Sequence, residues 1–157
     1  MRSLRRRNDW EKERIRMGEE GFTLDIVTLK KVAFSEAIKS VNAPGTEGYF
    51  SILVNHTPFV SSLKAGIIKV TRENEETSTF SMSGGFLMTD GKKVILLADA
   101  VERPEEVDVA RAQAAKERAE KRIAERTPDV DIDRARLALL RALNRLKVAE
   151  FSKMKQI

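Results

Sequence analysis

The sequence predicts a β plus α protein, in which an N-terminal antiparallel β-sandwich or flattened barrel is followed by an antiparallel two-helix hairpin. Two observations predict this architecture. Up to residue 103, short runs of strand-forming residues alternate with turn-forming residues, whereas after Pro104 the chain contains no Gly and becomes rich in Ala. We therefore divide the chain into a basic extension (1–20), a sandwich domain (21–103) and a hairpin domain (104–157).

The extension is basic, and the rest of the chain is nearly neutral. Residues 1–16 contain seven basic and three acidic residues, whereas the other 141 residues contain 22 basic and 21 acidic ones. The extension lacks the apolar segment of a secretory signal and is too acidic for a transit peptide. We expect it to be disordered or loosely helical. Met17 can be the start of a shorter product. A nucleic-acid-binding domain spreads basic residues over its folded body, and no such surface is expected here.

Eight short segments between Gly21 and Val101 predict strands, because they are rich in β-branched and aromatic residues. They are Phe22–Leu29, Val32–Phe34, Ala37–Val41, Tyr49–Val54, Ile67–Thr71, Thr77–Met82, Phe86–Thr89 and Lys93–Ala98. Turn formers separate most of them. The Asp90-Gly91 pair is typical of a type I′ hairpin turn, which has positive φ at both residues. At Gly84-Gly85 we expect a bend where one strand passes closely over another.

Two helices are expected after the sandwich. Residues 105–126 contain six Ala and no Gly or Pro, which favours a helix. Pro128 ends this helix, and either Asp129 or Asp131 can cap the next one, in which apolar residues recur at helical spacing from Ile132 to Leu146. A short break between helices of similar length predicts an antiparallel hairpin. Because few large apolar side chains hold the hairpin, an extended position costs little.

The composition offers little for catalysis. The absence of Cys excludes disulfides, zinc–thiolate sites and cysteine nucleophiles. His56 is the only histidine, and a general base or a metal ligand needs partners that the sequence does not supply. We therefore expect neither an enzyme nor a metal site. No apolar run approaches the roughly 18 residues of a membrane span, so membrane association is expected only through a partner.

Charged residues around the hairpin predict a nucleotide-binding site. These residues are Glu102, Asp108, Arg111, Arg118, Arg141 and Arg145. We call the four arginines the arginine seam, because folding about Pro128 brings the two helices that carry them side by side. Four guanidinium groups repel one another unless an anion lies among them, and Arg binds phosphate oxygens in pairs. The two carboxylates can accept hydrogen bonds from a base or ribose.

The alternative to a nucleotide site is a solvated helix face. On such a face the arginines pair with nearby acidic residues, and each pair contributes little to stability. The acidic candidates are Glu105, Glu106, Glu117 and Glu120.

Four short motifs, in the same order, resemble the epsilon subunits of bacterial F-type ATP synthases. The motifs are GTEGYFSILVNHTP at residues 45–58, GGF at 84–86, LAD at 97–99 and VDVARA at 107–112. The resemblance covers residues 21 to about 151. Three positions depart from the family pattern: Ser51 replaces Gly, Val54 replaces Pro, and Val107 replaces Ile or Leu. The basic extension has no counterpart in the family.

The resemblance implies a non-catalytic subunit of the rotor, at the cytoplasmic face of the bacterial cell membrane. The sandwich would bind the γ subunit and the ring of c subunits, with Glu47, Tyr49 and His56 at this interface. His56 can equally be a hydrogen-bonded turn residue. The VDVARA motif marks the family's regulatory ATP site, so ATP is expected at the arginine seam and no other cofactor is required.

The resemblance also implies that the hairpin has two positions. Folded on the sandwich, it permits ATP hydrolysis. Extended, it contacts the α and β subunits of the catalytic head and blocks rotation through basic residues that include Arg134, Arg136 and Lys147. Two other functions remain open: a scaffold whose hairpin forms a coiled coil with a partner, and a nucleic-acid module. Co-purification with α, β and γ chains would support the role in an ATP synthase over both of these alternatives.

Overall fold

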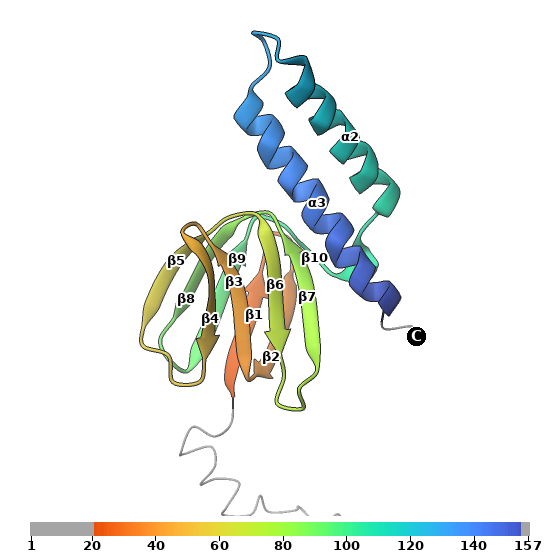
Figure 1. Cartoon of the computed structure of the whole chain (residues 1–157). Helices are drawn as coiled ribbons and strands as arrows, with labels where there is room; N and C mark the ends of the chain where they lie inside the picture. Colours follow the sequence, from red (N-terminus) through yellow and green to blue (C-terminus); the bar gives the residue numbers. More distant parts are fainter. Residues whose placement is uncertain (1–20, 155–157) are drawn as a thin grey trace, which may run out of the picture.

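The computed structural model describes residues 21–154 and has the predicted order of a β-sandwich followed by two helices (Figure 1). The expected basic extension lies outside the described residues. The strands are β1 (Phe22–Val27), β2 (Val32–Ile38), β3 (Ser40–Gly45), β4 (Gly48–Leu53), β5 (Phe59–Leu63), β6 (Gly66–Thr71), β7 (Thr77–Met82), β8 (Gly85–Thr89), β9 (Lys93–Ala98) and β10 (Val101–Glu102). A short 3-10 helix, η1 (Pro104–Glu106), precedes the helices α2 (Val109–Glu125) and α3 (Ile132–Met154).

The strands form one continuous sheet that folds over on itself. Its order is β10-β7-β6-β3-β5-β8-β9-β1-β2, and β4 pairs with β3 outside this path. Neighbouring strands are antiparallel except β1 and β9, which are parallel. The two halves of the sheet face each other in Figure 1, so the sheet encloses a core as a flattened barrel does.

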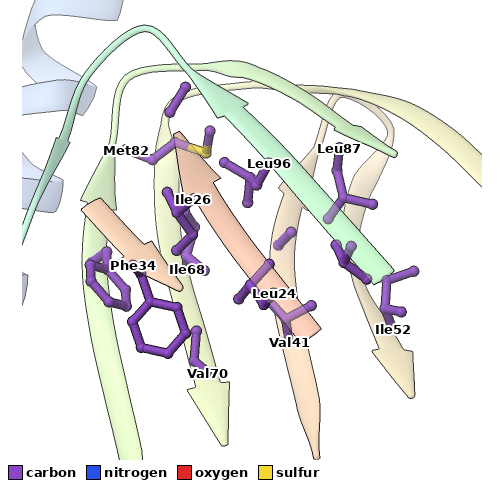
Figure 2. Packing of buried hydrophobic residues seen from close by; sticks show 14 of the residues in the cluster. Leu24, Ile26, Phe34, Val41, Ile52, Ile68, Val70, Met82, Leu87 and Leu96 are labelled. Carbon is purple, nitrogen blue, oxygen red and sulfur yellow. The ribbon is translucent and has the colours of Figure 1, made fainter. Parts of the chain in front are cut away.

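Alternate residues of the strands fill this core. On β1, Leu24 and Ile26 are fully buried, and Leu96 on the parallel neighbour β9 packs beside them (Figure 2). The opposite half of the sheet contributes Ile68 from β6. The buried cluster contains residues from Phe22 to Val101 and none from the helices, so the sandwich closes its core without the hairpin.

Two arginines contact β2, the strand at one edge of the sheet, from the opposite half. Arg72, just after β6, donates from Nε to Glu36 on β2 at 2.6 Å and lies 5.5 Å from the Phe34 ring centroid. Arg103 donates from Nη2 to the carbonyl oxygen of Ala33 at 3.0 Å and lies 5.7 Å from the Phe80 ring centroid. These contacts link β2 to the other half of the sheet without a ladder of backbone hydrogen bonds.

The strand prediction needs three corrections. The expected strand Ala37–Val41 is divided at Lys39, because β2 ends at Ile38 and β3 begins at Ser40. β3 runs through the expected turn at Pro44, which pairs with Tyr49 of β4. Neither β5 nor the two-residue strand β10 was predicted.

The Asp90-Gly91 pair does join β8 to β9, but the turn is not type I′. Only Gly91 has positive φ, at 94°. The Asp90 carboxylate accepts from the N–H groups of Lys92 and Lys93, both at 2.9 Å, and this side chain shapes a three-residue turn.

The expected close approach at Gly84-Gly85 is confirmed. Gly85 has φ of 150°, and a Cβ there would lie 1.9 Å from the carbonyl oxygen of Leu97 on β9. Only glycine permits this contact, because any side chain would overlap the neighbouring backbone.

An aspartate side chain caps the start of each helix. The Asp108 carboxylate accepts from the Arg111 N–H at 3.0 Å and begins α2. Of the two candidate caps for α3, Asp131 is the one used, since its carboxylate accepts from the Arg134 N–H at 2.9 Å. Arg126, at positive φ, ends α2.

Small residues hold the hairpin together. The buried alanines recur at seven-residue spacing, namely Ala112 and Ala119 on α2 and Ala135, Ala142 and Ala149 on α3. This spacing keeps one narrow face of each helix against the other, and alanine allows a close approach.

The hairpin contacts the sandwich only near its base. Val107, Ala112, Val148 and Ala149 form a small buried cluster, against which Ile67 of β6 and Leu146 pack. In Figure 1 the C-terminal part of α3 lies beside β7, while the tip of the hairpin projects beyond the end of the sandwich. None of the helices within residues 21–154 is long and apolar enough to cross a membrane.

Candidate functional site

The four arginines of the seam lie on the same side of the hairpin. Gln113 and Lys116 of α2, with Leu143 and Lys147 of α3, line a groove of about 570 Å³ along the other side. Each arginine of the seam is two residues away from one of these four. Two residues rotate an α-helix by about 200°, so Arg111, Arg118 and Arg141 lie opposite this groove. Arg145 lies between that side and the contact between the helices, because it is one turn from Ala149, which also lines the groove. Both helices therefore carry arginines on the side of the hairpin away from the centre of this groove.

At the base of the seam, two predicted site residues meet directly. Arg145 donates from Nε to a carboxylate oxygen of Glu102 at 2.5 Å. Both side chains are about one-third exposed. The pair joins α3 to β10, so a seam residue is also a contact between hairpin and sandwich. Asp108, the other predicted carboxylate of the site, lies six residues after Glu102. One of its carboxylate oxygens already accepts from the Arg111 N–H as the cap of α2.

The other three arginines of the seam have no carboxylate partner among residues 21–154. Arg111, Arg118 and Arg141 are exposed, and none of them forms an ion pair or side-chain hydrogen bond there. Exposed guanidinium groups that share one side of a hairpin produce a positive potential, which attracts anions.

The acidic residues of the alternative interpretation are largely engaged elsewhere. Glu106 pairs with Lys31 at 2.8 Å, Glu117 accepts from the Gln113 amide at 3.0 Å, and the Glu120 carboxylate lies 3.8 Å from the Lys116 ammonium. In the alternative interpretation these acidic residues pair with the seam arginines. No such pair is formed in the described part of the chain.

Glu47, Tyr49 and His56 do not form one cluster. Glu47 lies in the turn between β3 and β4, whereas His56 follows β4 at the opposite end of that strand. The Tyr49 hydroxyl accepts from the Ile67 N–H at 3.0 Å, which places it over β6.

The His56 ring lies in a turn at the far end of the sandwich. Its Nδ1 is 2.8 Å from the Thr57 carbonyl oxygen, and the ring packs edge-on against Phe59 with centroids 5.5 Å apart. These contacts agree with a hydrogen-bonded turn residue and leave the ring accessible to a partner.

The three basic residues predicted to contact the catalytic head are exposed but lie on different sides of α3. Arg134 is seven residues before Arg141 and so shares the side of the seam. Lys147 lines the opposite groove. Arg136 pairs with Asp133 at 3.4 Å and lies off the seam.

An apolar surface on the sandwich was not predicted from the sequence. We call it the apolar face: Val60 on β5, Phe86 and Met88 on β8, and Leu97 on β9, which are 36–70% exposed. Strand pairing places Met88 opposite Val60, and Phe86 opposite Leu97. A hollow of about 300 Å³ adjoins this face and is lined by Phe86, Leu97 and the fully exposed Leu29.

The signal for this surface was present in β8. Gly-Phe-Leu-Met-Thr carries apolar side chains on both faces, although only one face points to the core. A strand that is apolar on both faces indicates burial on both sides. Contiguous exposed apolar side chains on a folded protein mark a surface for a partner.

No group of acidic residues and histidine within residues 21–154 could hold a metal ion.

Family models match both parts of the chain. Residues 21–104 match the beta-sandwich domain of the ATP synthase delta/epsilon chain, and residues 105–150 match its long alpha-helix domain. Among curated relatives, the ATP synthase epsilon chain of Desulforamulus reducens is 44% identical over 127 residues, covering 81% of this chain and 96% of the relative. The epsilon chain of Pelotomaculum thermopropionicum is 48% identical over 133 residues, covering 85% of this chain and 98% of the relative.

A solved structure shares the fold. A chain of the Euglena gracilis mitochondrial ATP synthase, in a structure that comprises OSCP, F1 and the c-ring, aligns with a TM-score of 0.72 and 22% identity. The alignment covers 83% of this chain and 81% of the other.

Proposed function

The chain belongs to the delta/epsilon family of ATP synthase subunits, and on this premise we propose that it joins the γ subunit to the ring of c subunits in the rotor and that its hairpin regulates ATP hydrolysis. In this role the chain transmits torque and inhibition and carries out no reaction of its own. It works at the cytoplasmic face of the bacterial membrane, to which its partners attach it.

The observation that carries the rotor role is the apolar face together with the family match. A rotor subunit needs a firm interface, and fully buried apolar side chains supply most of the binding energy of such interfaces. Phe86 is 55% exposed and stands among Met88, Leu97 and Val60. We infer that the γ subunit covers this face. Glu47, Tyr49 and His56 lie at the two ends of the sandwich, where they can contact γ or the c-ring separately.

The regulatory role is supported by the weak attachment of the hairpin. A small apolar cluster and the pair between Arg145 and Glu102 hold α3 on the sandwich. Such a contact can be broken at modest cost, so a ligand that favours one position can shift the equilibrium by its difference in affinity.

ATP is the ligand proposed for the folded position. Arg145 and three arginines that form no ion pair within residues 21–154 line one side of the hairpin, and a triphosphate would relieve their mutual repulsion. Glu102 and Asp108 lie at the end of the seam nearest the sandwich, where the nucleotide base or the ribose is expected. When ATP is scarce, the hairpin extends, and Arg134, Arg136 and Lys147 become available to contact the α and β subunits.

Binding of the purified γ subunit tests the rotor role. Phe86→Asp places a charge in the centre of the apolar face and should weaken γ binding at least about tenfold, as loss of a central interface residue does. Leu137→Asp on α3 is the matched control, since Leu137 is 50% exposed and lies outside this face. Titration calorimetry measures both variants. Equal affinity of wild type and Phe86→Asp would rule out the apolar face as the γ interface.

A further inference from the structure

The connection between sandwich and hairpin is fixed along part of its length. It runs from β10 through Arg103 and η1 to Val107 and Asp108, where α2 is capped. If the hairpin moves, one point on this connection must change its backbone angles. The contacts of η1 indicate where that point lies.

Side chains around η1 hold it to the sandwich. The Glu106 carboxylate accepts from the Lys31 ammonium at 2.8 Å and from the Arg103 N–H at 2.9 Å. Arg103 in turn donates to the Ala33 carbonyl oxygen at the start of β2 and stacks on Phe80 of β7. These contacts stay within the sandwich and its connection, so they do not depend on the helices. η1 also lies against α3, and those contacts are lost when the hairpin leaves.

Lys31 belongs to a turn that is itself well fixed. The turn between β1 and β2, Thr28–Lys31, is closed by a backbone hydrogen bond from the Thr28 N–H to the Lys31 carbonyl oxygen at 2.9 Å. The Thr28 hydroxyl oxygen also accepts from the N–H groups of Lys30 and Lys31, at 3.3 and 3.2 Å. A turn closed in this way presents the Lys31 side chain from a fixed backbone.

Beyond η1 the connection changes character. Val107 and Asp108 are both extended, with φ near −75° and ψ of 119° and 98°. The Val107 side chain is buried in the cluster at the base of the hairpin, and Asp108 caps α2. Asp108 is thus bound to α2, whereas the Val107 side chain packs with the helices and its N–H donates to the Pro104 carbonyl oxygen of η1 at 3.4 Å. Among residues 21–154 no hydrogen bond joins either residue to a strand.

We propose that the β1–β2 turn, through Lys31 and Glu106, ties η1 to the sandwich as a strap, so that the hairpin pivots at Val107 and Asp108. In such a movement η1 would stay with the sandwich, so the rigid unit of the sandwich would end at Glu106 and not at Arg103. The regulatory meaning of this pivot rests on the proposed movement of the hairpin, but the strap itself is a property of the isolated chain.

Variants that release the hairpin from the sandwich show whether the strap persists without the contacts of α3. Val148→Asp places a charge in the buried cluster, and Arg145→Glu opposes Glu102; either variant should release α3 from the sandwich. Release is confirmed by the distance between labels on two introduced cysteines, which is practical because the chain has no native cysteine. In each released variant, NMR measures amide exchange at Glu106 and the titration of its carboxyl group.

If the strap holds, Glu106 keeps its hydrogen-bonded state after release. Its pKa lies below the ordinary value of 4.5 in the docked chain, because the Arg103 N–H and then Lys31 donate to the carboxylate. The Glu106 N–H donates to the Arg103 carbonyl oxygen at 3.0 Å, which should slow its exchange. We expect the depressed pKa and this protection to persist when α3 is released. Lys31→Met in the released background should speed exchange about two- to fivefold, the effect of losing one exposed ion pair, and should raise the carboxyl pKa.

Lys30→Met is the matched control, because Lys30 lies in the same turn and forms no ion pair within residues 21–154. It should change neither measurement. An ordinary Glu106 pKa and unprotected amide after release would show that η1 leaves with the hairpin and would overturn the proposal. Equal effects of Lys31→Met and Lys30→Met would also overturn it. Since neither γ nor ATP is used, these outcomes are independent of the γ-binding test.

Discussion

At the scale of single residues, arginines of this chain act in two ways that look alike in sequence. Arg72 and Arg103 lie against aromatic rings, donate to groups on β2 and close the sandwich. Arg111, Arg118 and Arg141 are exposed and form no ion pair with any carboxylate of the described residues. Sequence spacing identified the seam, because helical periodicity fixes the side on which a residue lies. It could not identify Arg72 as structural, because its partner Glu36 comes from a strand 36 positions earlier.

Arg111→Ala tests the seam. Removal of one charge-assisted partner of a phosphate should weaken ATP binding by about 1.5–3 kcal/mol, or roughly ten- to a hundredfold. The assembled enzyme should then be more inhibited at intermediate ATP concentration. Arg136→Ala is the control, since Arg136 lies off the seam and pairs with Asp133. Calorimetry on the isolated chain measures both affinities, and an unchanged affinity in Arg111→Ala would favour the solvated-face interpretation.

Glu36 links stability to pH. Hydrogen bonds from Arg72 hold the pKa of its carboxyl below the ordinary 4.5. A group whose pKa is lowered by folding stabilises the fold above its unfolded pKa, and this contribution is lost as the pH falls through the folded value. The urea concentration at the midpoint of unfolding should therefore decrease as the pH is lowered from about 5 to about 3. Glu36→Gln should show a smaller fall than wild type or Glu76→Gln, and identical pH profiles would contradict the role of this pair.

At the scale of elements, regular periodicity was easy to interpret and short polar strands were not. The Ala-rich helices and their break at Pro128 predicted the hairpin, and β7 and β9 were predicted with their observed bounds. β5 was missed because Ser61 and Ser62 interrupt its apolar pattern, and its position is set by pairing with β8. The β3 strand passes through Pro44 because the tertiary pairing with β4 overrides the local preference for a turn.

Ala142→Leu tests the close packing of the two helices. Ala142 is 1% exposed at the contact between them, so a larger side chain should separate the helices and cost about 1–3 kcal/mol. Ala124→Leu, at an exposed position of α2, is the matched control and should have little effect. Thermal unfolding followed by helical circular dichroism compares the two. An unchanged midpoint in Ala142→Leu would show that the helices are not closely packed.

At the scale of the whole molecule, the sandwich and hairpin have separate cores joined by few contacts. Sequence predicted this division because the period of the apolar pattern changes near Pro104. It did not predict the contacts across the border, such as Lys31 with Glu106, because they join residues 75 positions apart. The apolar face was missed for a related reason: the order of strands in the sheet decides which side of β8 is exposed.

A fragment ending at Arg103 tests the independence of the sandwich. Its buried cluster contains no residue of the hairpin, so the fragment should unfold cooperatively in urea and should still bind γ. It should no longer inhibit ATP hydrolysis. A fragment without a cooperative transition would show that the helices are part of the folding unit.

The movement of the hairpin in the assembled enzyme is the central claim, and a distance measurement tests it most directly. Labels at Asp129→Cys, in the tip of the hairpin, and Lys92→Cys, in the β8–β9 turn, report the position of the hairpin relative to the sandwich. Single-molecule energy transfer should give one distance with saturating ATP, that of the docked hairpin, and a second, longer distance when ATP is removed. One unchanged distance under both conditions would contradict a regulatory hairpin controlled by ATP.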